Sequence, residues 1–583
     1  MKPAPAAGAA TGKVPAVTVD GDPARTVGAQ ADTQVGSGPR RRFPRRLWLI
    51  VALQGLLMLA ATVLYPAFQN ADEVAHVDYV LAHRDGQWLD APGSLSYQAG
   101  SLAAKNLLPN TQVSEHVGGS PPLQRSQRLS FDALGAARPL SAFPNQMTQH
   151  PPLYYGVAAG FSYLLPNFSH HRFDIQVFWL RLLSVLLLLP VPLLIFSTAR
   201  RITGSQSVAL IASLLPLAIP SYLRTGSAVS NDSLLLLLMS AALALLARAA
   251  FGDLSRRTAV LIGLAWGGAL LTKGFALSLP PVIVLAYLVA SPGSLRRRIA
   301  LGWRPMIIAG AVGSAIGVWW WVRNVLVYHA VQPDGLGNLP DNLRQLTLGT
   351  SHGPGTELGF LRAFSKLLGK RTFGSLGLID MPTVAVPLLQ TLVIVLVLLM
   401  IASMLIGVGG LRARIPMLRD SSWSAGRAVA LMLPALLIIL MMYGSARSVY
   451  LRGQQLPGVQ VRYLLPASLG VLICVAVALC SLTGRFARWV APVLLTLTLG
   501  FIALSTFEVL EYEMSGRGRG RLALLKQGIR FVVGWSPLPS IGTSVLFLLT
   551  GLVAVLALIG FWFGAVADGR SNERAVSPAP SAG

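Results

Sequence analysis

Long apolar stretches recur along the whole chain, and no other feature of the sequence constrains its fold as strongly. A helix of about 17 to 25 apolar residues crosses about 30 Å of hydrocarbon at 1.5 Å per residue. We place twelve such stretches at 47–66, 174–198, 206–222, 232–250, 257–272, 274–290, 305–322, 384–408, 427–444, 462–483, 488–507 and 541–566. Because 53% of the residues are hydrophobic and 12% are charged, the sequence predicts an all-α integral membrane protein with about 12 to 13 transmembrane helices.

A shorter, proline-bounded segment at 151–166 either crosses the membrane as a thirteenth span or lies at the interface. Lys and Arg in short connections concentrate on the cytoplasmic side. If this segment does not cross, the cytoplasmic connections hold fifteen basic residues: Arg200, Arg201, Arg248, Arg256, Arg257, Arg296, Arg297, Arg298, Arg304, Arg412, Arg414, Arg419, Arg427, Arg485 and Arg488. The short outer connections hold Arg224 and Lys273. This asymmetry favours twelve spans, with 151–166 on or dipping into the outer leaflet.

The predicted topology gives a membrane domain at 47–566 and two cytoplasmic tails. Residues 1–46 are rich in Ala, Gly and Pro without a period and end in a basic cluster, so we expect a disordered tail and a cytoplasmic N-terminus. Residues 567–583 form the second tail. The sizeable outer loops include 67–173 and 323–383, so any chemistry is expected on the extracytoplasmic side of the cell membrane.

The net charge of +25 raises the question of a nucleic-acid partner. The basic residues, however, lie between apolar runs, where the positive-inside bias and phosphate-bearing lipids account for them. We therefore predict that the chain contacts membrane lipid and binds no nucleic acid.

Two adjacent carboxylates, Asp72 and Glu73, follow the first apolar stretch, where lipid gives way to water. One interpretation is structural: Asn70 caps a short helix, and Glu73 completes a capping box and complements the helix dipole. The other interpretation is catalytic. A carboxylate bordered by lipid has a raised proton affinity and suits the removal of a proton from a sugar hydroxyl. The residues alone leave both interpretations open.

Two further polar residues stand close to the second apolar stretch. His150 precedes a pair of prolines, and it is either an interfacial hydrogen-bonding group or a contact for a phosphate. Arg181 lies within a predicted span, about two turns from its outer end. An ionisable group at that depth is costly, so it must face a partner or a polar cavity. A structural salt bridge remains the rival interpretation.

Four more charged residues lie at the predicted outer ends of spans: Asp232, Lys273, Arg323 and Arg462. Taken singly, the acid is explained as a helix N-cap and each cation as a side chain that snorkels to the interface. Taken together, outward cations beside carboxylates run against the positive-inside trend. An anionic ligand explains them, and lipid phosphate fits, because cations neutralise the charge that develops as a phosphate leaves.

The order of several short motifs resembles one known family. DE follows the first stretch, HPPLYY precedes the second, LRLLSVL lies within it, SNDSL opens the fourth, TKG joins the fifth and sixth, WVRN follows the seventh and VRYLLP begins a late span. This order resembles the GT-C superfamily, integral membrane glycosyltransferases that use polyprenyl-phosphate sugars, over roughly 45–510. The resemblance implies that Asp72 is the catalytic base and Glu73 its neighbour or an acceptor-positioning group. It also implies that a lipid-phosphate pocket is shaped by His150, Arg181, Lys273, Arg323 and Arg462, and we assign Asp232 to the same site.

We therefore expect a GT-C-type bundle that moves a sugar from a polyprenyl phosphate to a cell-envelope glycan or protein by inverting displacement. The reaction is predicted to need no cofactor and no metal ligands are assigned, which leaves a divalent metal open. Two other classes fit the same residues: a flippase or exporter of lipid-linked sugar, and a non-catalytic protein of envelope assembly. The flippase would need a route from the cytoplasmic side, and no charged residue stands out deep in the inner half of the spans.

Overall fold

The computed structural model describes residues 43–108, 123–139, 143–336, 355–376, 379–380, 386–408, 415, 418, 421–453, 456, 458–515 and 520–576. The chain divides into two units, Met1–Pro44 and Arg45–Gly583, and the second contains every helix and strand discussed below. Residues 1–42 of the predicted N-terminal tail lie outside the described residues. The predicted C-terminal tail begins within the last helix, and 577–583 lie outside as well.

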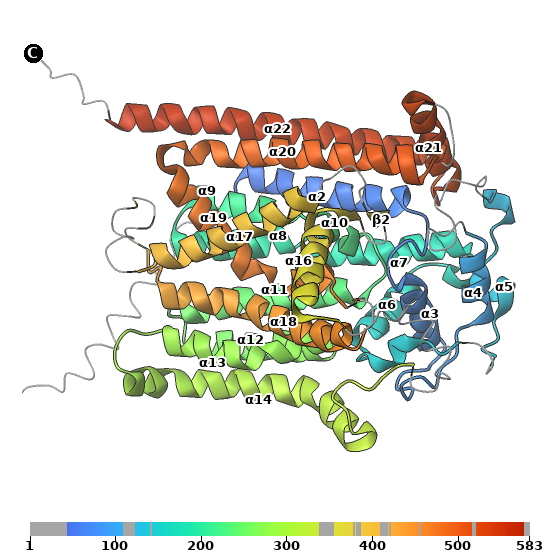
Figure 1. Cartoon of the computed structure of the whole chain (residues 1–583), viewed down its shortest axis with the longest axis horizontal. Helices are drawn as coiled ribbons and strands as arrows, with labels where there is room; N and C mark the ends of the chain where they lie inside the picture. Colours follow the sequence, from blue (N-terminus) through green and yellow to red (C-terminus); the bar gives the residue numbers. More distant parts are fainter. Residues whose placement is uncertain are drawn as a thin grey trace, which may run out of the picture. The chain divides into compact units, whose positions relative to one another are not determined.

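The unit Arg45–Gly583 is a helical bundle (Figure 1). The α-helices that fall on the predicted apolar stretches include α2 (Arg45–Leu64), α7 (Phe173–Leu188), α8 (Val191–Thr203), α9 (Gln206–Leu214), α10 (Pro220–Gly226), α11 (Asn231–Ala250), α12 (Arg256–Leu270), α13 (Leu279–Val289), α14 (Leu295–Tyr328), α17 (Val386–Ile406), α18 (Ala425–Leu451), α19 (Ser468–Thr483), α20 (Ala487–Glu508) and α22 (Ser540–Val576). The other described α-helices are α3 (Glu73–Arg84), α4 (Ala99–Asn106), α5 (Phe131–Gly135), α6 (Leu153–Tyr163), α16 (Glu357–Phe373) and α21 (Arg521–Trp535). Among the described residues, the only strands are the antiparallel pair β1 (Ser375–Leu376) and β2 (Ile379–Asp380). The predicted all-α class is therefore confirmed.

Within the described residues, eight helices are long and apolar enough to cross a membrane, or nine if one bent pair is a single span. Each of the twelve predicted stretches is helical, but three features lower the count. The helices α12 and α13 are too short, α9 and α10 are bent against each other by 78°, and α19 and α20 fall within one stretch, Val461–Glu511. That stretch turns at Gly484, whose φ of 51° is unfavourable for residues with a side chain.

The bend between α9 and α10 follows from its prolines. Pro216 lies in the short 3₁₀ turn that ends the first part, and Pro220 begins α10. Proline lacks an N–H and excludes the α conformation from the residue before it, so Ile219 is extended, with φ −108° and ψ 103°. The break turns α10 and its Arg224 into the interior of the protein, where this arginine is 3% exposed.

Small residues bring α12 and α14 into close contact. A Cβ added at Gly267 would lie 2.6 Å from Cβ of Ile316, and one added at Gly317 would lie 2.5 Å from the carbonyl oxygen of Gly267. Glycine at such positions lets helix backbones approach closely, which is how membrane helices pack without a hydrophobic driving force between them. The contact holds the last turns of α14 beside Leu270, whose carbonyl accepts a hydrogen bond from Trp321 Nε1 at 3.2 Å.

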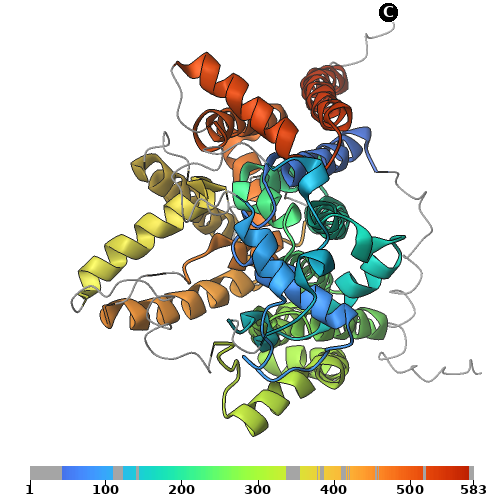
Figure 2. The same cartoon turned by 90° about the vertical axis from the view of Figure 1, so that its right-hand side faces the viewer.

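Helices α3, α4, α5 and α6 form within the predicted outer loop 67–173, at one end of the bundle (Figure 1). Figure 2 shows α3 lying across this end. Helices α3 and α6 pack through aromatic rings, with the centroids of Tyr79 and Tyr155 4.5 Å apart. The segment 151–166 forms α6, whose 11 residues span about 16 Å and are too short to cross a bilayer.

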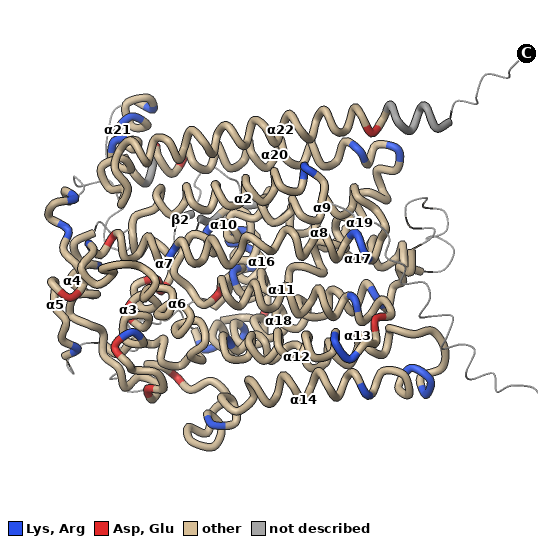
Figure 3. The backbone as a smooth tube through the Cα atoms, turned by 180° about the vertical axis from the view of Figure 1, so that it is seen from behind, with Lys and Arg blue, Asp and Glu red and all other residues tan. Residues whose placement is uncertain are grey.

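Basic residues gather at the opposite end of the bundle (Figure 3). There the ends of several helices meet: Arg201 lies 4.0 Å from Asp253, and Arg427 donates to the carbonyl oxygens of Ala250 and Ala290 at 2.8 and 3.2 Å. These connections are among those predicted to be cytoplasmic. The end that carries α3 to α6 holds basic and acidic residues together.

Candidate active site

A large open cavity lies where α3 meets the bundle. It encloses roughly 2150 Å³ of empty space, part of it open to solvent. Its walls come from the start of α3, from the segment before α6, from the turn after α12, from residues that follow α14 and from the segment before α19. Five of the eight predicted site residues line it: Asp72, Glu73, His150, Lys273 and Arg462.

Asp72 stands directly before α3 in a left-handed conformation, with φ 62° and ψ 9°. Its side chain makes no capping bond to the helix. Gln146 Nε2 donates to Oδ1 at 3.0 Å, and Arg462 Nη2 donates to Oδ2 at 2.8 Å. The predicted capping box is wrong, because α3 begins at Glu73 and Asn70 lies outside the helix. Both oxygens of Asp72 are instead held by side chains from other segments, and the side chain stays 35% exposed.

The charge on Asp72 is set by its neighbours. Burial would raise the pKa of its carboxyl, but the positive charge of Arg462, with a further contribution from Lys273, outweighs burial and lowers the pKa. The expectation of a raised proton affinity is therefore wrong in this structure. It failed because sequence position shows that a carboxylate borders lipid, but does not show which cation will lie beside it.

A second carboxylate, Asp232, lies behind the first. The N-cap of α11 is Ser230, so Asp232 is inside the helix and is 1% exposed. Lys273 Nζ donates to its Oδ1 at 2.6 Å, and Nε of Arg462 lies 3.8 Å from its Oδ2. Arg462 thus stands between Asp72 and Asp232, and four charges from four distant segments form one network.

Glu73 is turned away from this network and is fully buried. Its carboxylate accepts two hydrogen bonds from Arg181, at 2.8 and 2.6 Å, and one each from the backbone N–H groups of Phe68 and Val229. Arg181 also donates to the carbonyl oxygens of Thr62, Tyr65 and Pro66. All five N–H groups of the guanidinium are used, so the structure gives Arg181 the alternative role weighed above, a structural salt bridge.

Two buried histidines border the cavity. Burial, together with the nearby positive charge of Lys273, lowers the pKa of His150 well below its usual value and that of His76 to about 3. Both rings are neutral at pH 7. His76 Nδ1 is hydrogen-bonded to the hydroxyl of Tyr155 at 3.0 Å. A contact between His150 and a phosphate would therefore be a hydrogen bond from a neutral ring.

Arg323 does not join the site. Its guanidinium stacks over Trp320 and Tyr328 and hydrogen-bonds the hydroxyl of Tyr328 at 3.1 Å. It is absent from the cavity lining, which receives Trp321 from the same helix. Motif order predicted the right segment, but the helical phase of α14 directs the arginine elsewhere.

Sequence reasoning missed Gln146, which holds Asp72. It lies in a 3₁₀ turn, Gln146–Gln149, and stands five residues before the first of the paired prolines. The segment after α14 packs against it: a Cβ added at Gly335 would lie 2.5 Å from the carbonyl oxygen of Gln146. Nothing in the local sequence indicates either contact, since one glutamine among polar residues has no distinguishing pattern.

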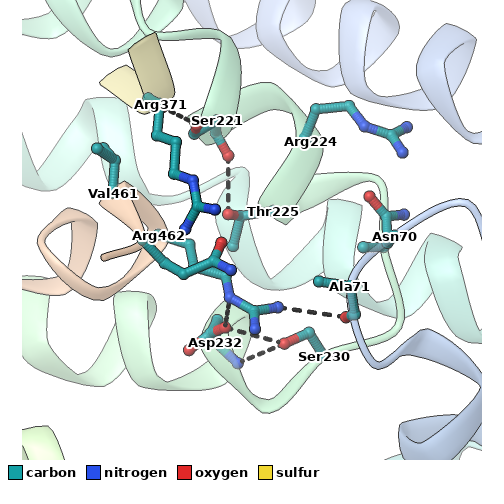
Figure 4. Close-up of a pocket in the computed structure, with 12 residues that line it drawn as sticks. Asn70, Ala71, Ser221, Arg224, Thr225, Ser230, Asp232, Arg371, Val461 and Arg462 are labelled. Carbon is teal, nitrogen blue, oxygen red and sulfur yellow. Dashed lines mark hydrogen bonds and ion pairs between the residues drawn. The ribbon is translucent and has the colours of Figure 1, made fainter. Parts of the chain in front are cut away.

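A smaller pocket of about 560 Å³ adjoins the large cavity and shares Asn70, Ala71, Gln460 and Arg462 with it (Figure 4). Arg224 and Arg371 also line it, together with Ser221, Thr225, Ser230 and Asp232. Figure 4 shows Arg224 on the side of Asn70, apart from Arg371. Across the described residues, no group of three or more His, Cys, Asp or Glu is placed to hold a metal ion.

Residues 149–321 match the family described as dolichyl-phosphate-mannose-protein mannosyltransferase. This segment contains four of the eight predicted site residues: His150, Arg181, Asp232 and Lys273. No curated protein matches the chain.

The chain also matches solved structures, at low sequence identity and with TM-scores below 0.5. ArnT from Cupriavidus metallidurans bound to undecaprenyl phosphate is 17% identical, with a TM-score of 0.44 over 90% of this chain and 76% of that one. Archaeal oligosaccharyltransferase AglB from Archaeoglobus fulgidus, in complex with an inhibitory peptide and a dolichol-phosphate, is 12% identical, with a TM-score of 0.36 over 88% and 56%. Arabinosyltransferase EmbB from Mycobacterium smegmatis is 12% identical, with a TM-score of 0.38 over 92% and 43%.

A multi-span helical membrane protein with a charged cavity at one end is the class that fold and site define. The family match specifies it further over residues 149–321: this segment is similar to a glycosyltransferase family, and the predicted resemblance to GT-C glycosyltransferases is confirmed there.

Proposed function

We propose that this protein transfers a sugar from a polyprenyl-phosphate donor to a hydroxyl of a cell-envelope acceptor, with Asp72 as general base. The observation that carries the proposal is the position of Asp72 on the cavity wall, partly exposed and hydrogen-bonded to Arg462. A base must reach its substrate, and Asp72 does so where the fully buried Glu73 does not.

The reaction is a single displacement. The carboxylate of Asp72 takes the proton of the acceptor hydroxyl, and that oxygen forms a bond to the anomeric carbon of the sugar. The bond between this carbon and the phosphate oxygen breaks on the opposite face, and its electron pair leaves with the lipid phosphate. The anomeric configuration inverts, and Asp72 ends protonated.

Arg462 links the two halves of this reaction. In the structure, it holds the pKa of Asp72 down, which makes the carboxylate a weak base. A donor phosphate that approaches Arg462 competes with Asp72 for the guanidinium. As the ion pair loosens, burial raises the proton affinity of Asp72, so the base strengthens when the donor is bound. The guanidinium then stabilises the charge on the leaving phosphate.

Lys273 and Arg462 supply the positive charge that a metal would otherwise provide, so the proposed mechanism uses no metal and no cofactor. Lys273 lies at the cavity wall with its ammonium 2.6 Å from Asp232, which fixes its position. Lys273, held by a buried carboxylate, is preorganised and needs little rearrangement during the reaction.

We place the site on the extracytoplasmic face. The gathering of basic residues at the end opposite α3 supports this orientation, because short basic connections stay in the cytoplasm (Figure 3). The donor then reaches the cavity from the outer leaflet, and the acceptor from the envelope.

The test is product formation by the purified protein in detergent, supplied with polyprenyl-phosphate sugars and an envelope acceptor fraction and followed by mass spectrometry. Wild type and an Asp132→Asn control, in which an exposed aspartate of α5 is changed, should consume donor and form product, and Asp72→Asn should not. Movement of labelled donor across vesicles without any product would instead favour a flippase, and full activity of Asp72→Asn would move the base elsewhere.

A further inference from the structure

Arg224 has unused hydrogen-bonding capacity in the interior of the protein. It is 3% exposed, and its Nη2 donates to the carbonyl oxygen of Gln69 at a long 3.3 Å. Its Nε and Nη1 have no hydrogen-bond partner, and the flat guanidinium lies over the ring of Tyr65 with 3.4 Å between Cζ and the centroid. Buried donors without a partner are costly, and more so on a charged group.

The unpaired groups bordering this pocket are all donors. Nδ2 of Asn70 and Nε of Arg462 also lack hydrogen-bond partners, and both residues line the smaller pocket with Arg224. The carboxylate of Asp232 is engaged by Lys273, and that of Glu73 by Arg181. A pocket bordered by unpaired buried donors of two arginines and one amide fits an anion with several oxygens.

An apolar groove begins at the same arginine. It encloses about 690 Å³, and its walls come from α2, α10, α20 and α22. Leu57, Ala60, Ala61 and Leu64 form the α2 side, which runs for about 10 Å along that helix. Arg224 is the only charged residue among those lining the groove. A groove that is apolar along its length and cationic at its end complements a lipid whose head carries a phosphate.

We propose that Arg224 and Asn70 bind the phosphate of a long-chain lipid phosphate monoester or diester, and that the first part of its chain lies in the groove between α2, α10, α20 and α22. The phosphate then sits on the far side of Arg462 from the large cavity. A sugar carried on it points past Arg462 toward Asp72, and the large cavity is left to the acceptor. This assignment rests on the proposed function and adds the position of the donor.

Binding can be measured without catalysis. Purified full-length protein is titrated with a long-chain polyprenyl monophosphate, with a short-chain analogue, with the matching alcohol and with inorganic phosphate. We expect the long-chain phosphate to bind tightest and inorganic phosphate to compete poorly. Arg224→Gln and Asn70→Asp, which remove a cation and add an anion, should each weaken binding about 10- to 100-fold. Arg362→Gln, at an exposed arginine of α16, should bind as wild type does.

The groove has its own matched pair of variants. Ala61→Phe fills the α2 wall and should weaken binding of the long-chain phosphate more than that of the short-chain analogue. Gly551→Phe adds the same ring to an exposed face of α22, where an added Cβ meets nothing within 4 Å, and should change neither. Equal affinity of Ala61→Phe and wild type for the long chain would overturn the groove assignment.

Several outcomes contradict the phosphate site. Wild-type affinity in Arg224→Gln, binding of the alcohol as tight as that of the phosphate, or equal competition by inorganic phosphate would each overturn it. Arg224→Lys keeps the charge and should retain part of the affinity. Thermal midpoints in detergent show which variants are folded. If Arg224→Gln does not fold, the binding affinities of Asn70→Asp and Ala61→Phe test the lipid site in its place.

The same titration separates this proposal from the proposed function. Asp72→Asn should lose transfer and still bind the lipid phosphate. Transfer by Asp72→Asn, with binding still dependent on Arg224, would overturn the assigned base and leave the lipid site. Loss of transfer in Asp72→Asn, with binding independent of Arg224, would overturn the lipid site and leave Asp72 as the base.

Discussion

Arg462 Nη2 and Asp72 Oδ2 lie 2.8 Å apart although 390 residues separate them in the chain. The pair joins the segment before α19 to the residue directly before α3, and its arginine lines both the large cavity and the smaller pocket. The two sides differ in character, because the large cavity carries His150 and Lys273 and the smaller pocket leads through Arg224 to an apolar groove.

Asp72→Asn should lower turnover by about 10²- to 10⁴-fold, the usual contribution of a general base. Because Asp72 is 35% exposed and makes no capping bond, the thermal midpoint should change little. Turnover and melting are measured on the same preparation. A variant with both values near wild type contradicts the assignment of the base.

Glu73→Gln should act on stability instead. It leaves the Arg181 guanidinium buried without its carboxylate, a change that costs about 3 to 5 kcal/mol in free energy of unfolding. A double-mutant cycle with Arg181→Met checks the cause, since removing both charges should recover much of the loss. If Glu73→Gln is as stable as wild type but loses activity, Glu73 has a catalytic role that its burial does not indicate.

Gly335→Ala should lower turnover without a change at any catalytic group. The added Cβ would lie 2.5 Å from the carbonyl oxygen of Gln146, so the segment must move, and with it the side chain that holds Oδ1 of Asp72. Gly160→Ala, on an exposed face of α6 where an added Cβ meets nothing within 4 Å, is the control. Equal activity of the two variants would show that Gln146 does not position Asp72.

Arg462→Gln should move the acid limb of the kcat/KM profile to higher pH. In the wild type, Arg462 lowers the pKa of Asp72, so the free enzyme keeps its base ionised down to below about pH 3.9, the ordinary value for aspartate. Without Arg462, burial acts with less opposition and raises the pKa, so the base becomes protonated at a higher pH. The profile is measured alongside a stability profile, and an unchanged acid limb would mean that Asp72 is not the titrating base.

Much of the fold was predictable because apolar length is a local property. Each of the twelve predicted stretches is helical, and 151–166 forms a helix too short to cross. The count of spans was less predictable, since the prolines that bend α9 against α10 act through the geometry of packing. The family resemblance could also be recognised from the sequence, because the order of motifs along the chain can be seen without knowing which residues are in contact.

The sequence by itself determined a helical membrane bundle and a set of charged residues at one end of it. Only the tertiary structure decided how those charges pair: Glu73 with Arg181, Asp72 with Arg462, Asp232 with Lys273, and Arg323 with aromatic rings. Helix formation and membrane insertion depend on residues close together in the chain, so short stretches of sequence are enough to predict them. An ion pair depends on distances of a few ångströms between segments hundreds of residues apart, and those distances exist only once the helices have packed.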